Sequence, residues 1–159
     1  MPTTFAVEKT LGRLGKWLRL MGFDTLSEIE CPKGTFGQRV GLERILLTRT
    51  RHSAMTKAGR STIFIQANDP AEQVVELIQK AAIRWEDTQP FSRCLLCNER
   101  IISVSRQVVL KAVPDYISNT QAVFSACPKC GRIYWKGSHT ERALKRLSAA
   151  FSRPDGSDN

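Results

Sequence analysis

Residues 4–26, TFAVEKTLGRLGKWLRLMGFDTL, place a strand, a helix and a second strand in direct succession. Thr4–Glu8 is short and mostly apolar, which is typical of a buried strand. Leu11–Phe23 carries apolar residues at three- and four-residue spacing, which predicts an amphipathic helix that ends at Gly22. The apolar stripe consists of Leu11, Leu14, Leu18 and Met21, with Trp17 beside it. Phe23–Leu26 is predicted to be the second strand.

The same alternation of strands and helices continues to about residue 83. Arg44–Thr48 is a continuous apolar run, as expected for a strand buried on both faces of a parallel sheet. The other expected elements are a loop over Glu28–Gly37, a short helix over Phe36–Leu42, a loop entering a helix over Arg49–Ala58, a strand over Ser61–Ile65 and a helix from Pro70 to about Ile83. The order predicts a small α/β domain over residues 1–88.

Two cysteine pairs follow, Cys94-Leu-Leu-Cys97 and Cys127-Pro-Lys-Cys130. A two-residue gap lets one tight turn direct both thiolates at a single ion, and two such pairs complete a tetrahedral zinc site. Asn98 and Gly131 follow the pairs, and both residue types tolerate left-handed backbone. Two disulfides or four buried free thiols are the alternatives to structural zinc. The fifth cysteine, Cys31, is expected to be an unpaired loop thiol.

The second half of the chain is therefore predicted to be a β-rich zinc ribbon with a C-terminal helix, residues 89–151. Its expected parts are a linker over Trp85–Arg93, a strand over Ile101–Ser105, a turn region over Lys111–Ile117, a strand over Arg132–Trp135 and a helix over Glu141–Phe151. Residues 152–159 are polar and expected to be disordered.

The net charge of +9 and the pI near 9.7 favour a polyanionic partner, of which nucleic acid is the commonest. No run approaches the roughly 18 apolar residues of a membrane span. The N-terminal residues MPTTFAVEKT lack the apolar core of a secretory signal. We therefore expect a cytoplasmic protein with reduced thiols and no membrane partner.

Three segments in this order resemble one family, the Mut-seven C-terminal domain proteins, which are PIN-like ribonuclease domains followed by a zinc ribbon. They are LGRLGKWLRLMGFDT (Leu11–Thr25), RILLTR (Arg44–Arg49), and the two cysteine pairs continued as CGRIYWKGSH through His139. The resemblance covers residues 4 to about 147. It implies a metal-dependent endoribonuclease, in which acidic residues at the carboxyl ends of parallel strands hold Mg²⁺ or Mn²⁺. The catalytic candidates that it implies are Glu8, Asp24 and Glu43.

Several acidic positions of the family are replaced in this chain. Glu8 stands where the family has Asp, and Thr50 and His52 stand at the two positions of an Asp-x-Asp stretch, beside Arg49 and Arg51. Arginine repels a divalent cation and attracts phosphate. We therefore expect a degenerate carboxylate site, with persistent metal-dependent cleavage as the alternative. His52 as the general base of a metal-free reaction would need a second acid or base.

The expected function is RNA binding or RNA processing. The candidate RNA contacts are Arg13, Lys16, Arg19, Arg49, Arg51, Tyr134, Lys136 and His139. The basic residues could equally form solvated faces, and Tyr134 or Trp135 could pack against the last helix instead of stacking on bases. Two other hypotheses are a non-catalytic adaptor that docks on a ribosome, tRNA or other ribonucleoprotein, and a protein–protein module whose charge only aids solubility.

Overall fold

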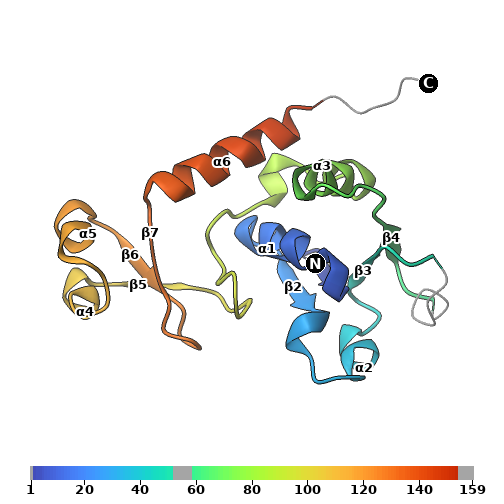
Figure 1. The fold of residues 1–159 in the computed structure, drawn as a ribbon, viewed down its shortest axis with the longest axis horizontal. Helices are drawn as coiled ribbons and strands as arrows, with labels where there is room; N and C mark the ends of the chain where they lie inside the picture. Colours follow the sequence, from blue (N-terminus) through green and yellow to red (C-terminus); the bar gives the residue numbers. More distant parts are fainter. Residues whose placement is uncertain (1, 52–58, 154–159) are drawn as a thin grey trace.

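The computed structural model describes residues 2–51 and 59–153 and contains two sheets (Figure 1). A four-stranded parallel sheet lies in the first half of the chain, and a three-stranded antiparallel sheet lies in the second half. The predicted mixture of an α/β domain and a β-rich four-cysteine unit is confirmed. His52, most of the loop predicted after Arg49 and most of the predicted tail lie outside the described residues.

The parallel sheet has the strand order β2-β1-β3-β4. Its strands are β1 (Thr4–Val7), β2 (Asp24–Ser27), β3 (Ile45–Thr48) and β4 (Thr62–Phe64). β1 and β3 occupy the middle and are buried on both faces, which explains their uninterrupted apolar sequences. The chain order reverses between β1 and β3, and ligands of open parallel sheets bind beyond the carboxyl ends of the strands at such a point.

Helices cover both faces of this sheet. α1 (Gly12–Leu20), preceded by the 3₁₀ turn η1 (Lys9–Leu11), and α3 (Pro70–Lys80) pack on one face, and α2 (Phe36–Val40) packs on the other. Gly15 allows α1 to approach β1 closely, because a Cβ atom there would lie 2.8 Å from a methyl carbon of Val7. Gly22 ends the helical segment with a φ of 95°, as its position predicts.

The last helix, α6 (Ser138–Phe151), runs from the ribbon back to the α/β domain (Figure 1). Its Leu147 is buried in the same core as residues of β1, α1 and α3. Phe151 meets Trp85, in the 3₁₀ turn η3 (Trp85–Asp87), edge to face at 5.4 Å. The domain division predicted from sequence placed this helix with the ribbon, but its apolar face packs on the first domain.

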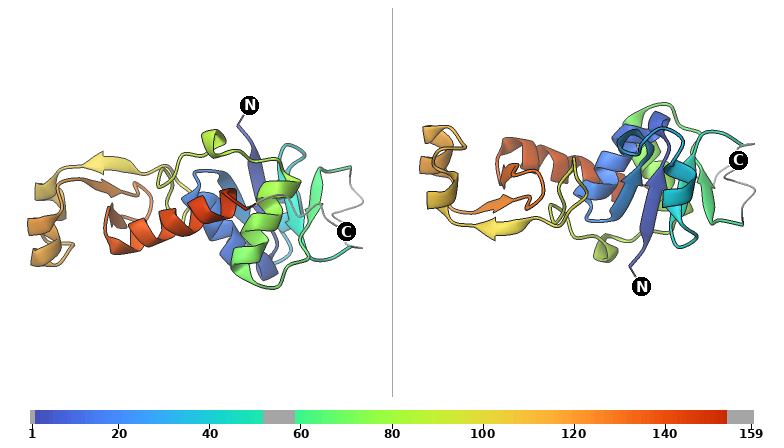
Figure 2. Two further views of the ribbon diagram at one scale, coloured as in Figure 1. Left: turned by 90° about the horizontal axis from the view of Figure 1, so that it is seen from above. Right: turned by 90° about the horizontal axis from the view of Figure 1, so that it is seen from below.

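The antiparallel sheet consists of β5 (Ile102–Val104), β6 (Phe124–Ala126) and β7 (Ile133–Trp135), in that order. Two short helices, α4 (Arg106–Val109) and α5 (Asp115–Thr120), lie between β5 and β6 at the end of the molecule far from the parallel sheet (Figure 2). The turn region predicted over Lys111–Ile117 is therefore wrong from Asp115 onward. Pro114 stands at the N-cap of α5, where its missing N–H is not needed.

Candidate metal centre and phosphate-binding groove

The four paired cysteines converge on one point. Their Sγ atoms all lie within 4.8 Å of one another, and the Sγ atoms of Cys94 and Cys130 are 3.8 Å apart. A zinc ion with Zn–S bonds of about 2.3 Å in tetrahedral geometry requires sulfur–sulfur distances of about 3.8 Å. Among the described residues, no other group of three or more His, Cys, Asp or Glu side chains is close enough to share a metal ion.

The two cysteine turns have the same backbone geometry. Asn98 and Gly131 adopt φ values of 64° and 73°, as their positions after the cysteine pairs predict. The amide of Asn98 donates to the carbonyl of Cys94, and the amide of Gly131 donates to the carbonyl of Cys127, both at 2.9 Å. The two turns are therefore built alike, as expected for two cysteine pairs that share one ion.

Tyr134, on β7, hydrogen-bonds to the four-cysteine cluster. Its hydroxyl donates to the Sγ atom of Cys94 at 3.1 Å and accepts the amide of Leu95 at 3.1 Å. Burial raises the pKa of Cys94, but the hydrogen bonds from Tyr134 and from backbone amides outweigh it and lower the pKa to about 7. Hydrogen bonding to Cys130, together with burial, raises the pKa of Cys97 to about 12. Four thiolates at these distances therefore need a cation to coexist.

The three carboxylates predicted to form a catalytic site do not come together. Glu8 follows the last residue of β1, whereas Asp24 pairs with Thr4, the first residue of that strand. Four residues of strand span about 13 Å. Glu43 precedes β3 and so lies, like Asp24, at the amino edge of the sheet. The prediction of one site is corrected for this reason: the parallel strands place Glu8 and the other two acids at opposite edges.

Asp24 instead joins the α/β domain to the ribbon. Its Oδ1 atom accepts from Arg44 at 2.6 Å and from the Asn98 amide group at 2.9 Å. The Oδ1 atom of Asn98 in turn accepts the amide of Thr25 at 2.9 Å. Burial raises the pKa of Asp24, but the hydrogen bonds from Arg44 and Asn98 and the charges of Arg44 and Arg93 hold it below its usual value.

Arg19, predicted to contact RNA, is 2% exposed and belongs to the same junction. Its guanidinium binds both carboxylate oxygens of Glu30 at 2.7 Å. It also donates to the carbonyls of Thr25, Leu95 and Leu96. A guanidinium with these partners has no free edge for phosphate. The prediction for Arg19 is therefore corrected, because the ribbon covers the C-terminal end of α1.

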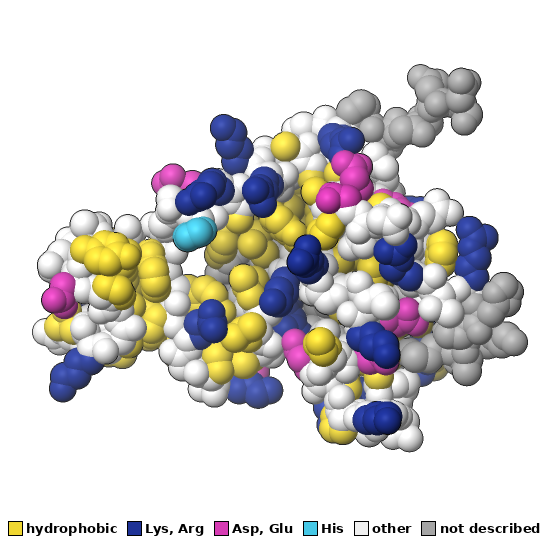
Figure 3. Space-filling model, in the orientation of Figure 1, with side chains coloured by type: hydrophobic (Ala, Val, Ile, Leu, Met, Phe, Trp, Pro, Cys, Tyr) yellow, Lys and Arg dark blue, Asp and Glu magenta, His cyan; other side chains and the backbone are white. Residues whose placement is uncertain are grey.

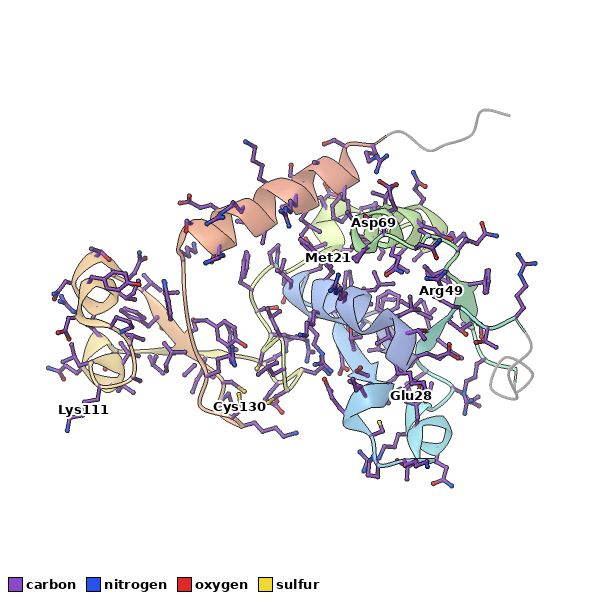
Figure 4. The ribbon with its side chains drawn as sticks, in the orientation of Figure 1. Met21, Glu28, Arg49, Asp69, Lys111 and Cys130 are labelled. Carbon is purple, nitrogen blue, oxygen red and sulfur yellow. The ribbon has the colours of Figure 1, made fainter. Side chains whose placement is uncertain are left out.

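A groove of about 660 Å³ runs along the carboxyl edge of the sheet, and we call it the carboxyl-edge groove. Its lining includes five basic side chains, Lys9, Arg13, Lys16, Arg19 and Arg49, and one acidic side chain, Glu30. Figure 4 shows Glu28, Arg49 and Asp69 around the start of α1, each from a different connection. Space-filling side chains of Lys and Arg lie over α1 on this side (Figure 3).

Arg49 and Glu8 meet where the strand order reverses. The guanidinium of Arg49 donates to Asn68 Oδ1 at 2.5 Å. The backbone amide of Arg49 donates to a carboxylate oxygen of Glu8 at 3.4 Å. Thr48 and Thr50 hydrogen-bond to each other within the turn after β3. The predicted site thus has one carboxylate here, beside an arginine and two threonines.

The start of α1 also faces the carboxyl-edge groove. Its N-cap Leu11 offers no side-chain acceptor, and Gly12 lines the groove with open space where a Cβ atom would lie. The positive end of the helix dipole attracts anions. The backbone therefore adds to the positive potential of Lys9, Arg13 and Lys16.

The other predicted RNA contacts lie elsewhere. Arg51 stacks over Phe64 at 4.7 Å from the ring centroid, and both residues line a separate hollow beside β4. Tyr134, Lys136 and His139 line a groove of about 550 Å³ between the ribbon and α6. Trp135 also lines that groove and is partly buried against the small ribbon core. The predicted contacts therefore form three separate groups instead of one surface.

Sequence reasoning missed three residues at the carboxyl edge. Lys9 and Asn68 line the carboxyl-edge groove, and Glu28 accepts the amide of Lys9 at 2.8 Å. Each follows a predicted strand, and the carboxyl ends of parallel strands meet at one edge. Reading the residues after every strand would have found them.

Comparison with known proteins gives one family match. The family model described as Mut7-C RNAse domain matches residues 3–147, which include both sheets and the four cysteines. No curated protein and no solved structure matches the chain. Within residues 2–51 and 59–153, no helix is long and apolar enough to cross a lipid bilayer.

Proposed function

The chain belongs to the Mut7-C RNAse domain family, and we propose that it binds RNA through a ribonuclease-like fold whose carboxylate site is degenerate. The proposal rests on the carboxyl-edge groove. Lys9, Arg13 and Lys16 line it without an ion pair or side-chain hydrogen bond to any described residue. Unpaired cations at the reversal of strand order are placed to neutralise phosphates.

The donor set at this edge does not fit a Mg²⁺ or Mn²⁺ ion. These ions require several oxygen ligands, usually carboxylates, in near-octahedral geometry. Glu8 is the one predicted acid at this edge, and the guanidinium of Arg49 lies in the same groove region. The positive charge of the arginine attracts a phosphate and repels a divalent cation. We therefore derive no metal-dependent step, and we infer binding without metal-dependent cleavage.

Zinc is the metal that we propose for the four cysteines. Four thiolates with tetrahedral spacing suit zinc, whereas Mg²⁺ and Ca²⁺ prefer oxygen ligands. The ribbon's own hydrophobic core is small, with Val109, Val113 and Phe124 as its buried members. The metal would hold the two cysteine turns together and so position the ribbon against the end of α1. It would have no open coordination position for catalysis.

The test is a titration of single-stranded RNA with the protein at several salt concentrations. The logarithm of affinity should fall linearly with the logarithm of salt concentration, by about 0.7 for each phosphate neutralised. Lys16→Ala should weaken binding and reduce that slope by about 0.7. Lys111→Ala, an exposed lysine at the far end of the ribbon, is the matched control and should change neither. The proposal would be contradicted if the two variants weakened binding equally, or if the affinity did not depend on salt concentration.

A second candidate function is the adaptor that docks on a ribonucleoprotein. It is favoured by exposed apolar side chains on the helices at the tip of the ribbon, where Val108 is 65% and Tyr116 is 68% exposed. Exposed apolar residues that lie together mark protein contact sites, whereas single exposed apolar residues are common on any protein surface. Capture of ribosomal or other protein subunits that survives ribonuclease and is lost in Tyr116→Ser would support it.

A further inference from the structure

A second groove, of about 630 Å³, lies between α1, the start of α3 and α6, and we call it the α1–α6 groove. Arg13 and Pro70 line both this groove and the carboxyl-edge groove. The two grooves are therefore neighbours, with Arg13 and Pro70 between them. Each falls within the size range of about 300–1,000 Å³ that is usual for ligand sites. Of the proposed phosphate contacts Lys9, Arg13 and Lys16, only Arg13 lines the second groove.

The floor of the α1–α6 groove is apolar and contains an aromatic ring. Trp17 from α1 lies there with Val74 and Val75 from α3 and with Leu147 and Ala150 from α6. Trp17 is partly buried, so one part of the indole packs on the core while another part lines the groove. Figure 3 shows a band of hydrophobic side chains between α6 and α1, bordered by Lys and Arg side chains.

The charged residues around this floor are mostly basic. Arg153 is held by Glu72 at 2.6 Å, and Asp69 accepts the amides of Ala71 and Glu72 at the start of α3. Arg13 and Arg146 make no ion pair or side-chain hydrogen bond with any residue that the structure describes. Two free guanidinium groups thus stand beside an apolar, aromatic-containing floor, which is the composition of sites that bind nucleobases and their phosphates together.

We propose that the α1–α6 groove is a nucleobase subsite for single-stranded RNA. In this arrangement, phosphates follow the carboxyl-edge groove, and bases of the same strand pack against Trp17 once the strand passes Arg13. Arg146 neutralises a phosphate or stacks on a base at the far side. The inference rests on the proposed function, because the strand must first occupy the carboxyl-edge groove. The nucleobase subsite also defines the preferred substrate. This is a single strand with unpaired bases, since a base inside a duplex cannot reach the indole of Trp17.

The experiment compares two oligouridylates, of about 4 and about 12 nucleotides, which span the site sizes of single-strand binding modules. Arg146→Ala should weaken binding of the longer RNA by roughly tenfold and leave the shorter one unchanged. Lys145→Ala is the matched control, because Lys145 is the preceding exposed residue on α6 and lines neither groove. Ultraviolet crosslinking should join the longer RNA to the peptide that contains Trp17.

An abasic oligomer of the same length separates base contacts from phosphate contacts. It should bind the unchanged protein more weakly than the long oligouridylate, and Trp17→Leu should remove most of that difference. Because Trp17→Leu also alters packing, its thermal unfolding is measured, and the crosslink provides a readout on the unchanged protein.

The outcomes separate the two proposals. Suppose the long RNA binds and Lys16→Ala weakens it, but Arg146→Ala behaves like Lys145→Ala and no crosslink reaches Trp17. The nucleobase subsite is then wrong, and the proposed function stands. If neither RNA binds at all, both are wrong. A Trp17 crosslink together with a selective Arg146→Ala effect supports the subsite.

Discussion

Arg19 shows how far a single side chain can depart from its sequence pattern. It follows Arg13 and Lys16 at three-residue spacing along an amphipathic helix. If this helix were isolated from the rest of the protein, the Arg19 side chain would be exposed to solvent. In the folded chain, the backbone of Leu95 and Leu96 covers it, and it satisfies their carbonyl groups. No local rule predicts this burial, because the cover comes from a segment far away in sequence.

Arg19→Ala should therefore lower the free energy of unfolding by about 2–4 kcal/mol, since it leaves Glu30 and buried carbonyls without their partner. Arg13→Ala, on the exposed side of the same helix, should change stability by less than about 0.5 kcal/mol. Chemical denaturation of the two variants measures this difference. Equal stabilities would show that the guanidinium does not hold the junction.

Asp24 gives the junction a pH dependence. Its pKa is lowered in the folded protein from a usual value near 3.8, so its ionised form stabilises the fold. This contribution is fully present above the usual value and is lost as pH falls through the folded-state pKa. Asp24→Asn should therefore be less stable than the unchanged protein by about 1–2 kcal/mol at pH 7, and the gap should close on acidification. A gap that widens in acid would contradict this role.

At the scale of elements, periodicity and glycine positions predicted the parallel sheet and its long helices well. The strands around Ala6 and Leu46 are apolar on both faces because both faces are covered, and that pattern is visible in the sequence. α4 and α5 were missed because each is too short to show a helical period. The sequence also could not predict which domain α6 packs against, since its apolar stripe could pack on either one.

Gly15 tests the contact between α1 and β1. In Gly15→Ala, the added methyl group would lie 2.8 Å from a methyl carbon of Val7, so either α1 or the Val7 side chain would have to move. We expect a net loss of about 1–2 kcal/mol, because overpacking outweighs the gain in helix propensity. Gly12→Ala is the control, since a Cβ atom there has open space, and it should be neutral or slightly stabilising. The melting temperatures of both variants test this expectation. Equal changes in the two melting temperatures would show that α1 and β1 do not approach closely at Gly15.

At the scale of the whole molecule, the ribbon and the α/β domain form one connected unit. The linker adds to the junction, because the amides of Gln89 and Phe91 donate to the carbonyls of Met21 and Leu20. α6 then returns to pack on α3 (Figure 1). The cysteine spacing correctly predicted that the four cysteines converge on one point. The separation of the carboxylates could also have been predicted from the sequence, because Glu8 ends the predicted strand Thr4–Glu8 whereas Glu43 precedes the predicted strand Arg44–Thr48.

Removal of the metal should therefore destabilise more than the ribbon. Thiolates that lose their cation repel one another, and the turn that carries Leu95, Leu96 and Asn98 loses its shape. We expect one zinc per chain by elemental analysis. A strong chelator should also lower the melting temperature of the α/β domain and weaken RNA binding. An unchanged melting transition after complete metal loss would show that the two units are independent.

The central claim is that the carboxyl-edge groove binds RNA without metal-dependent cleavage. Its most direct test is the length of an end-labelled single-stranded RNA recovered from its complex with the protein after incubation with Mg²⁺ or Mn²⁺. The arrangement of Glu8, Arg49 and Thr50 predicts full-length RNA, with recovery reduced in Lys16→Ala. Shorter products that require the metal and disappear in Glu8→Gln would contradict the account.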